Sequence, residues 1–333
     1  MIITRTPFRI SFFGGGTDYP AYFRIAGGEV LSTSIDKYCY ISIRRLPPFF
    51  EHKFRVSYSK IELTNSVDEI EHPSVRNVLK WKNIDDGTEI LHIGDLPARS
   101  GIGSSSSFTV GFLHALNAQQ RHSIDKKQLA AEAIHIEQNL IQEPVGAQDQ
   151  IAAAYGGLNH IEFKTDGSFN VSPVCLQPNV LQRLESSLMM FFTGVTRLSH
   201  EYSSAKIKNI PRRDTELSHM RKLVGEALQI LHRQDSDIDD FGRLLHENWQ
   251  LKKTLSDKVT APHLEEIYNT AMVAGALGGK LMGAGGGGFF VFYVPKEKQE
   301  SVKQALSGLV HVPFQFDDDG SSIVVNKSEC MYG

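Results

Sequence analysis

The sequence predicts an α+β protein with two domains. A chain of 333 residues exceeds what one compact core usually holds. Its first half mixes alternating apolar runs with helical patterns, whereas its second half contains three amphipathic helices and two continuous apolar runs. The pattern changes near Pro173 and Pro178, which gives predicted domains of residues 1–172 and 173–333.

The first half is expected to alternate strands with helices. Residues 2–13 alternate loosely and end at three glycines, as a strand that enters a turn should. A helix that opens at Asp149 is expected to stop at Gly156 and Gly157. The other predicted strands are residues 38–44, 54–61, 89–93 and 158–163, and the other predicted helices are residues 105–119 and 126–141.

The second half is expected to be mainly helical. Leu217, Met220, Val224, Leu228 and Leu231 recur at helical spacing and define the apolar face of its first long helix. The other elements predicted here are helices at residues 241–255, 261–278 and 296–309 and strands at residues 188–192 and 289–294.

Residues 317–320 (DDDG) have two interpretations. Three neighbouring carboxylates could bind a metal ion. However, Asp-Gly between alternating strands is typical of a tight turn. We therefore predict a hairpin at this point.

Charge and composition exclude several classes of protein. The net charge is −3 with both signs interspersed, so no nucleic acid partner is expected. Cys39, Cys175 and Cys330 lack zinc-ligand spacing and are expected to be reduced thiols. The sequence has no basic leader followed by a long apolar segment and no apolar run long enough to span a bilayer. We therefore expect no membrane partner and a cytoplasmic location.

Three segments are rich in glycine or serine, at residues 13–18, 101–107 and 283–288. Glycine lets backbone amides approach a phosphate closely. The third segment satisfies GxGxxG, but a helix precedes it and a strand follows it, which reverses the order in a dinucleotide-binding fold. Lys280 is followed by Leu281, so the GxxxxGK[ST] motif of P-loop proteins is missing as well.

The segment at residues 97–107 (PARSGIGSSSS) runs into a predicted helix with an apolar stripe. The first amides of a helix are unpaired and its dipole favours negative charge, so such a loop can bind phosphate. One serine could instead merely cap the helix. Because the two glycines of this segment and the four serines at residues 104–107 exceed what a cap requires, a phosphate site is the favoured interpretation.

Four motifs together resemble the GHMP kinases, the family named for galactokinase, homoserine kinase, mevalonate kinase and phosphomevalonate kinase. They are residues 6–19 (TPFRISFFGGGTDY), 97–107, 146–150 (GAQDQ) and 280–289 (KLMGAGGGGF), in the family's order. The resemblance implies an ATP- and Mg²⁺-dependent kinase of small molecules. It also implies an N-terminal domain like ribosomal protein S5 domain 2 and a ferredoxin-like C-terminal domain, with the acceptor bound between them.

The resemblance also implies roles for single residues. Asp149 would be the base or orienting group for the acceptor hydroxyl, and Arg9 would neutralise charge beside it. Ser105 and Glu137 would hold Mg²⁺; without the resemblance, Glu137 would be interpreted as an exposed acid on an amphipathic helix. The residues implied for ATP are Arg99, Ser100, Gly101, Ile102, Gly103, Ser104, Ser105 and Ser106. Those implied for the acceptor are Gly15, Gly16, Thr17 and Asp18.

Departures from the family pattern bear on the acceptor. Gly15 and Gly16 stand where galactokinases carry Glu-His, so galactose is not the expected substrate. Within the family, the chain is most similar to bacterial D-glycero-D-manno-heptose 7-phosphate kinases. Such an enzyme would form the 1,7-bisphosphate used to make nucleotide-activated heptose for surface polysaccharides. The segments that support this likeness are residues 12–20, 27–30, 146–150 and 193–197.

A phosphorylated acceptor requires fixed cations. Arg197 is the first candidate for substrate binding, followed by Lys53 and Arg55, although each could also be a solvated surface charge. Two other functions are compatible with the sequence. One is an anomeric kinase of an unphosphorylated sugar such as fucose, galactose or heptose, and the other is a non-catalytic sugar sensor. The expected partner is a small sugar or sugar phosphate, and a homodimer is compatible with the sequence.

Overall fold

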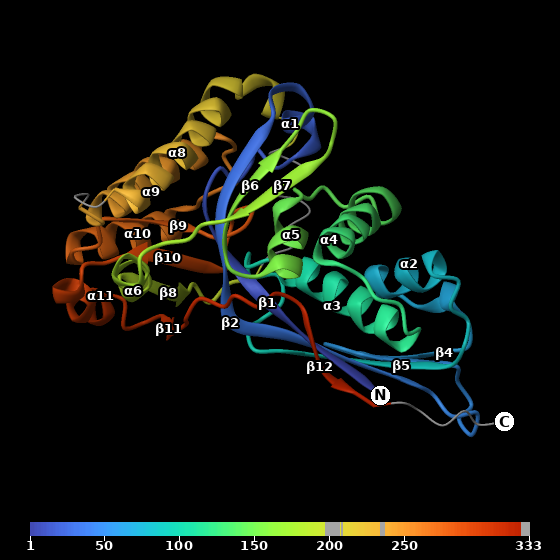
Figure 1. Ribbon diagram of the computed structural model, residues 1–333. Coiled ribbons are helices and arrows are strands. Elements are labelled where there is room, and N and C mark those ends of the chain that lie inside the picture. Colours follow the sequence, from blue (N-terminus) through green and yellow to red (C-terminus); the bar gives the residue numbers. More distant parts are fainter. Residues whose placement is uncertain (197–206, 208, 234–236, 328–333) are drawn as a thin grey trace.

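The structure, a computed structural model, describes residues 1–196, 207, 209–233 and 237–327, which form two sheets with packed helices (Figure 1). The strands of the larger sheet are β1 (Ile2–Phe13), β2 (Gly28–Arg45), β3 (Phe54–Ser57), β4 (Ile61–Thr64), β5 (Thr88–Gly94), β6 (Leu158–Phe163), β7 (Phe169–Pro173) and β12 (Ser322–Asn326). Those of the smaller sheet are β8 (Leu188–Phe192), β9 (Gly278–Leu281), β10 (Phe289–Tyr293) and β11 (Val310–Val312).

The helices lie between these strands along the chain. They are α1 (Pro20–Ala26), α2 (Pro73–Trp81), α3 (Ser104–Gln119), α4 (Lys126–His135), α5 (Gln148–Tyr155), α6 (Pro178–Ser186), α8 (Asp214–His232), α9 (Asp239–Thr254), α10 (Pro262–Ala274) and α11 (Gln299–Ala305). Shorter turns are Val67–Glu69, Ile210–Arg212 and Lys296–Lys298, of the 3-10 type, and Ile136–Leu140, of the π type.

The long antiparallel pair of β1 and β2 is the centre of the larger sheet. The strand order is β12-β1-β2-β5-β3-β4, and β6 joins it by pairing with β2 and with β7. Residues 6–13 of β1 are buried without alternation. Phe241 of α9 packs on Phe12 and Phe13, with ring centroids 5.3 and 5.1 Å apart. This half of β1 therefore lies between the two domains, where both of its faces are covered.

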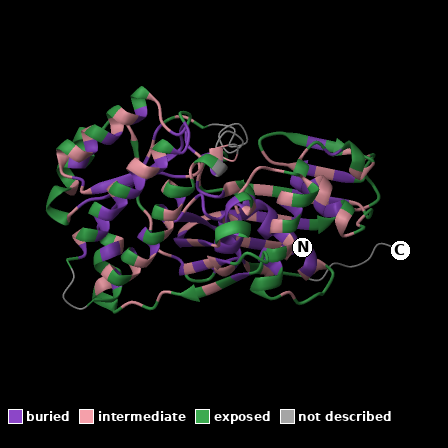
Figure 2. Cartoon of the chain, turned by 90° about the horizontal axis from the view of Figure 1, so that it is seen from above, coloured by how far each residue is buried: buried purple, intermediate pink, exposed green. Residues whose placement is uncertain are grey.

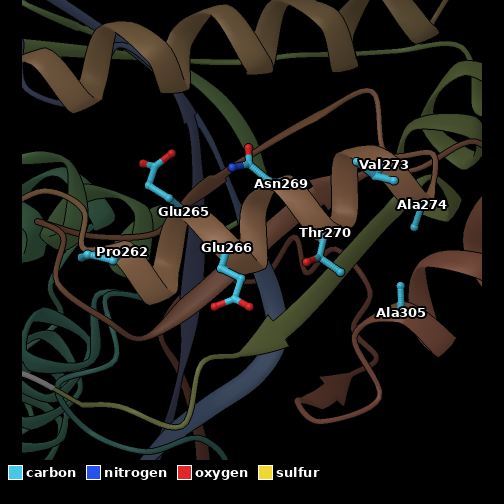
Figure 3. Close-up of a pocket in the computed structure, with 8 residues that line it drawn as sticks. All are labelled: Pro262, Glu265, Glu266, Asn269, Thr270, Val273, Ala274 and Ala305. Carbon is cyan, nitrogen blue, oxygen red and sulfur yellow. The ribbon is translucent and has the colours of Figure 1, made fainter.

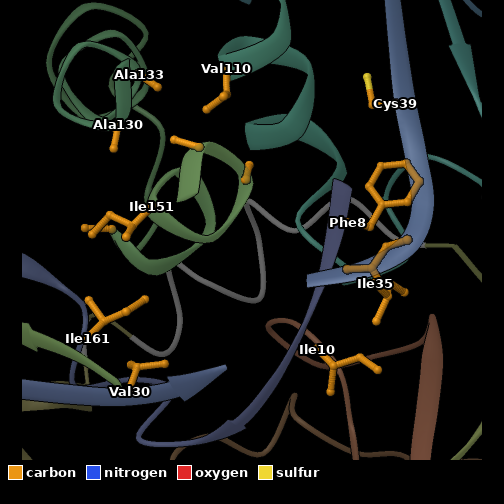
Figure 4. Packing of buried hydrophobic residues seen from close by; sticks show 14 of the residues in the cluster. Phe8, Ile10, Val30, Ile35, Cys39, Val110, Ala130, Ala133, Ile151 and Ile161 are labelled. Carbon is orange, nitrogen blue, oxygen red and sulfur yellow. The ribbon is translucent and has the colours of Figure 1, made fainter. Parts of the chain in front are cut away.

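Helices α3, α4 and α5 cover one face of the larger sheet (Figure 1). α3 and α5 both pack on β1 and β2, and α4 packs on α5. Val30 of β2, Val110 of α3, Ala133 of α4 and Ile151 of α5 belong to one buried cluster (Figure 4). Burying a Val or Ile side chain contributes about 1.5–3 kcal/mol. This layer therefore holds the first turns of α3 and α5 firmly against the sheet.

The smaller sheet and its helices have an aromatic core. Trp249 of α9, Tyr268 of α10 and Phe290 and Phe292 of β10 are fully buried, with neighbouring ring centroids 5.2 to 6.1 Å apart. Figure 2 shows exposed residues on the outward sides of the helices that cover this sheet. Their amphipathic patterns predict this arrangement.

Most predicted elements are present, some with shifted ends. Strands β6 and β8 have the predicted bounds, and α3 begins one residue earlier than predicted. Two strands, β3 and β4, replace the single strand predicted at residues 54–61. The helix expected to reach residue 278 ends at Ala274, because Gly275 closes it with a left-handed φ of 117°. β9 then begins at Gly278.

The sequence pattern predicts none of the helices α1, α2 and α6. Each has a proline at its start, namely Pro20, Pro73 and Pro178. Proline suits the first turn of a helix because its missing N–H would have no partner there. It is equally common in loops, so a proline alone does not distinguish a helix start from a boundary between domains.

The hairpin predicted at residues 317–320 is wrong. β11 pairs with β8 in the smaller sheet, whereas β12 pairs with β1 in the larger sheet. The segment between them crosses from one sheet to the other, and its carboxylates bind groups of the larger sheet. Tyr38 Oη donates to Asp317, and Arg5 Nη2 lies 3.0 Å from Asp319 Oδ2. The end of the predicted second domain thus contributes a strand to the sheet of the first.

None of the described helices is long and apolar enough to cross a membrane. α8, with 19 residues, includes the charged side chains of Glu216, Arg221, Lys222 and Glu226. A helix that spans a bilayer needs about 20 predominantly apolar residues.

Gly225, in the middle of α8, allows a test of how far a glycine destabilises this helix. A Cβ built on this residue meets no atom within 4 Å. Glycine in a helix costs roughly 0.5–1 kcal/mol relative to alanine. We expect Gly225→Ala to raise the free energy of unfolding by about that amount, measured as a higher urea midpoint at an unchanged m value. A lower midpoint would contradict the open surroundings of this position.

Candidate active site

Arg9 of β1 and Asp149 of α5 form a bidentate ion pair, called here the Arg9–Asp149 pair. Arg9 Nε and Nη2 lie 2.8 and 2.9 Å from the two carboxylate oxygens of Asp149, and Arg9 Nη1 donates to Gly101 O at 2.7 Å. Arg9 is 4% exposed, whereas the Asp149 side chain is 26% exposed. The pair is therefore held rigidly, and the carboxylate keeps an open side that can accept a hydrogen bond from a ligand.

Two glycine-rich loops meet beside this pair. Gly103 has a φ of 78°, and a Cβ built on it would lie 3.4 Å from Arg9 Cγ and 3.6 Å from Asp149 Cγ. A Cβ on Gly101 would lie only 2.5 Å from Met282 O. The loop before α3 thus packs backbone to backbone on the loop after β9. Glycine is required at both positions, because of the left-handed φ at Gly103 and the close approach at Gly101.

Among the described residues, the first backbone amides of α3 have no acceptor, and they lie next to the Arg9–Asp149 pair. The N-cap of this helix is Gly103, which has no side chain to satisfy them. Ser106 Oγ donates to Glu137, and Ser107 Oγ donates to a carbonyl of β1, both at 2.8 Å. Ser105 is exposed. Because the cap position is a glycine, the first amides and the positive end of the helix dipole can bind an anion.

Glu137 is a fully buried carboxyl group on the π-helical turn Ile136–Leu140. Such turns are rare and frequent at functional sites. Ser106 Oγ donates to Glu137 Oε2 at 2.8 Å, and Gln150 Nε2 donates to the same oxygen. Burial raises the pKa of Glu137 to about 7, and the nearby Glu143 adds to this rise. The interpretation of Glu137 as an exposed acid is therefore wrong, and the group titrates near neutral pH.

The oxygens around Glu137 suit a small, hard cation. Glu137 Oε1 and Gln150 Oε1 are buried and have no hydrogen-bond partner among the described residues. Buried oxygens without partners are costly, and Mg²⁺ prefers oxygen ligands. In the described part of the chain, His, Cys, Asp and Glu side chains form no metal-binding group of three or more. An ion here would therefore take most of its ligands from phosphate and water.

The structure brings Ser106, rather than Ser105, into contact with Glu137. Both serines belong to the first turn of α3, where Ser106 is buried and Ser105 is exposed. The sequence motif alone does not separate these neighbouring hydroxyl groups. Replacing each serine separately by alanine distinguishes which of them is a metal ligand.

The loop implied for the acceptor is held together by its own side chains. Asp18 is 1% exposed and accepts hydrogen bonds from Gly16 N at 2.8 Å and from Gln148 Nε2 at 2.9 Å. Thr17 Oγ1 donates to Gly14 O at 2.8 Å. These contacts let Asp18 and Thr17 orient the loop and tie it to the start of α5.

Two of the three cations predicted for a phosphorylated acceptor lie away from the Arg9–Asp149 pair. Lys53 pairs with Asp85 at 3.1 Å, and Arg55 pairs with Glu89 at 3.2 Å. Arg55 is on β3, and strands β2 and β5 lie between β3 and β1. At the usual spacing of strands, β3 is roughly 14 Å from β1, which carries Arg9. The third, Arg197, lies outside the described residues.

Gln148 and Gln150 are polar side chains that the resemblance leaves without a role. They flank Asp149, so one turn of α5 supplies three neighbouring side chains to the site. Gln148 donates to Asp18, and Gln150 donates to Glu137. Their position in the motif at residues 146–150 is the signal by which the sequence could have identified them.

A surface hollow of about 630 Å³ lies elsewhere, on the outer side of α10 (Figure 3). Its lining includes Glu265, Asn269 and Val273 of α10 and Ala305 at the end of α11. Val273 is 90% exposed. Since the lining comes only from helices of the second domain, this hollow is separate from the site around Arg9.

Comparison with known proteins agrees with the geometry in both halves of the chain. The family model for the GHMP kinases N terminal domain matches residues 69–157, and that for the GHMP kinases C terminal matches residues 223–311. The first of these ranges contains the start of α3, Glu137 and Asp149.

Several known proteins are similar over nearly their whole length. The D-glycero-alpha-D-manno-heptose 7-phosphate kinase of Campylobacter jejuni is 29% identical over 317 residues, 92% of this chain and 93% of that protein. The galactokinase of Pyrococcus furiosus is 27% identical and covers 92% of each chain. The crystal structure of a D-glycero-D-manno-heptose 1-phosphate kinase from Bacteroides thetaiotaomicron has a TM-score of 0.79 at 25% identity, covering 98% and 100% of the two chains.

A mevalonate kinase structure also shares the fold, with a TM-score of 0.72 at 20% identity, covering 96% of this chain and 100% of that one. The two-domain architecture predicted from the sequence is thus confirmed.

Proposed function

Because this chain belongs to the GHMP kinases, a family of ATP-dependent phosphotransferases, we propose that it phosphorylates the anomeric hydroxyl of D-glycero-D-manno-heptose 7-phosphate. The 1,7-bisphosphate product would serve the synthesis of nucleotide-activated heptose for surface polysaccharides, a cytoplasmic reaction sequence that uses ATP. The observation that supports a kinase most directly is the Arg9–Asp149 pair beside the first amides of α3. The heptose is favoured by the Campylobacter jejuni relative.

Phosphoryl transfer depends mainly on positioning and on neutralising charge. In the proposed reaction the loop at residues 99–106 and the first amides of α3 bind the phosphates of ATP. Asp149 orients the acceptor hydroxyl and accepts its proton while the new oxygen–phosphorus bond forms and the bond to ADP breaks. Arg9 holds the carboxylate in place and keeps positive charge beside the reacting oxygens.

We propose that Glu137 holds Mg²⁺ together with a serine hydroxyl of the first turn of α3, Ser105 or Ser106. The unpartnered Glu137 Oε1 supports this assignment. Bound Mg²⁺ would neutralise charge on the transferred phosphate.

The alternative function is an anomeric kinase of an unphosphorylated sugar, because a galactokinase and about a third of the L-fucokinase/L-fucose-1-P guanylyltransferase of Bacteroides fragilis also match the chain. A coupled ADP-release assay on heptose 7-phosphate, heptose, fucose and galactose separates the two. We expect the highest kcat/KM with heptose 7-phosphate. A preference for a free sugar would favour the alternative. Sugar binding with no ADP release from any of the four would indicate a non-catalytic sugar sensor.

Arg197 remains the proposed anchor of the 7-phosphate. Arginine can hold two phosphate oxygens at once, so its loss should matter only when the acceptor has a phosphate. We expect Arg197→Ala to lower kcat/KM for heptose 7-phosphate roughly ten- to hundredfold and to spare free heptose. Lys53→Ala, which removes an exposed cation paired with Asp85, is the matched control and should behave as wild type. An equal loss on both acceptors would exclude Arg197 as the anchor.

A further inference from the structure

Lys252 of α9 is a buried lysine that holds the start of the third glycine-rich loop. It is 3% exposed. Its Nζ donates to Leu281 O at 2.5 Å and to Gly283 O at 2.7 Å. Lysine is almost never buried unless its amino group is paired, because removing this group from water is costly. A buried lysine on two backbone carbonyls of one segment therefore indicates a defined task at that segment.

The third glycine-rich loop packs directly on residues 99–106, the loop proposed to bind ATP and called here the nucleotide loop. A Cβ built on Gly283 would lie 2.5 Å from Gly101 Cα, and one built on Gly288 would collide with Ser100 O. The two backbones are thus in close contact at both ends of the third loop. Because neither has room to yield, the position of the third loop determines the positions of Ser100 and Gly101.

The nucleotide loop is in turn tied to the Arg9–Asp149 pair. Gly101 O accepts a hydrogen bond from Arg9 Nη1 at 2.7 Å, and Arg9 N donates to Ile102 O at 3.1 Å. A continuous set of contacts therefore leads from Lys252 through the two loops to the proposed reacting groups. Groups that touch a ligand keep their working geometry only when such supporting contacts hold them.

Helix α9 is itself fixed against the first domain. Phe241 packs on Phe12 and Phe13, and Asn248 Nδ2 donates to Phe12 O at 3.0 Å. Asn248 and Lys252 are four residues apart and therefore lie on the same face of the helix. The face of α9 that binds the end of β1 thus also holds the third loop, so the amino group of Lys252 is anchored on a rigid element.

Lys253, the next residue of α9, contacts a different element. Its Nζ donates to Glu265 of α10 at 3.0 Å, and its side chain is partly exposed. The Nζ atoms of Lys252 and Lys253 lie 5.7 and 5.9 Å from the centre of the Trp249 ring, so the two lysines share this aromatic neighbour. Replacing Lys253 therefore controls for the loss of a lysine from this part of α9.

We propose that Lys252 is a positioning residue that fixes the third glycine-rich loop against the nucleotide loop and thereby preforms the site for the phosphates of ATP. This inference rests on the proposed kinase function. Lys252 acts through the third loop and takes no part in the phosphoryl transfer itself. Without its amino group, the carbonyls of Leu281 and Gly283 would lose these two hydrogen bonds, and the third loop could shift away from the nucleotide loop.

The test compares Lys252→Met, which keeps the length of the side chain but has no donor, with wild type and with Lys253→Met. Calorimetry gives the dissociation constant of a non-hydrolysable ATP analogue, and then that of heptose 7-phosphate with the analogue at saturation. We expect Lys252→Met to weaken binding of the analogue roughly tenfold and to leave binding of the sugar within about twofold of wild type. Lys253→Met should bind both ligands as wild type does.

Hydrogen exchange of the peptide that covers residues 97–107 gives a second readout. Without nucleotide, its amides should exchange faster in Lys252→Met than in wild type, whereas those of β6 and β7 should not change. Lys252→Gln, which is shorter but keeps an N–H donor, should show the same changes at a smaller size. This second variant decides the question if Lys252→Met does not fold.

Wild-type affinity for the ATP analogue in the folded Lys252 variants would overturn the proposal. An equal loss of affinity for the analogue and the sugar, faster exchange throughout the protein, or failure of both variants to fold would also overturn it, because each would mean a general loss of structure. The ADP-release assay tests the proposed function separately. A wild-type protein that binds the analogue but releases no ADP would refute the kinase, while the binding comparison still decides the role of Lys252. A wild-type protein that does not bind the analogue would overturn both.

Discussion

Replacing Asp149 by asparagine is expected to lower kcat by roughly a hundredfold or more and to leave ATP affinity within about threefold of wild type. Asparagine keeps the shape of the side chain but cannot take the proton of the acceptor hydroxyl. It also breaks the bidentate pair with Arg9, whose two contacts to this carboxylate are 2.8 and 2.9 Å. A coupled assay of ADP release gives kcat, and titration with an ATP analogue gives the dissociation constant.

Asp166→Asn is the matched control for this experiment. Asp166 lies in the exposed turn between β6 and β7, and the same chemical change there should leave turnover unaffected. A kcat of Asp149→Asn within about threefold of wild type, less than ~1 kcal/mol, would remove Asp149 from the reaction. Loss of ATP binding at an unchanged unfolding midpoint would move its role to the nucleotide.

The second large effect concerns Mg²⁺ and pH. The pKa of Glu137 is raised to about 7 by burial, and only the ionised carboxylate is a good ligand for the ion. Protons and Mg²⁺ therefore compete, and the Mg²⁺ concentration needed for half-maximal rate should rise as the pH falls through 7. Glu137→Gln should raise this concentration roughly ten- to hundredfold, since even outer contacts of a metal site have effects of that size. In the Glu137→Gln variant, the Mg²⁺ concentration needed for half-maximal rate should also depend little on pH.

Magnesium titrations at pH 6, 7 and 8 test this expectation, with Glu137→Gln correcting for the protonation of ATP itself. Ser105→Ala and Ser106→Ala extend the comparison. The serine whose replacement causes the larger rise in Mg²⁺ requirement should be the metal ligand. Ser106 is the alternative to Ser105, because its Oγ donates to Glu137 Oε2 at 2.8 Å. Unchanged Mg²⁺ dependence in both Glu137→Gln and Ser105→Ala would mean that the ion is bound elsewhere.

Local sequence patterns determined much of the fold and of the candidate site. A continuous apolar run gave strand β8 its bounds, and apolar residues spaced along Leu158–Phe163 gave those of β6, because burial of a short strand is visible in its own residues. The glycines before α3 and the serines of its first turn indicated a phosphate site, since unpaired amides at a helix start depend on a few neighbouring residues. The helices that the sequence pattern did not predict, α1, α2 and α6, were missed for a local reason too. Each begins at a proline, and a proline alone does not distinguish a helix start from a loop.

Only the tertiary structure decided which distant groups meet. Arg9 and Asp149 are 140 positions apart, and Lys280 is 268 positions from the Phe12 carbonyl that it contacts. The same holds for β12, whose pattern suits a strand but does not say which sheet receives it. A periodic pattern specifies which face of an element is buried, and many partners can cover such a face. Register, domain packing and burial select one of them, so the Arg9–Asp149 ion pair and the environment of Glu137 became visible only in three dimensions.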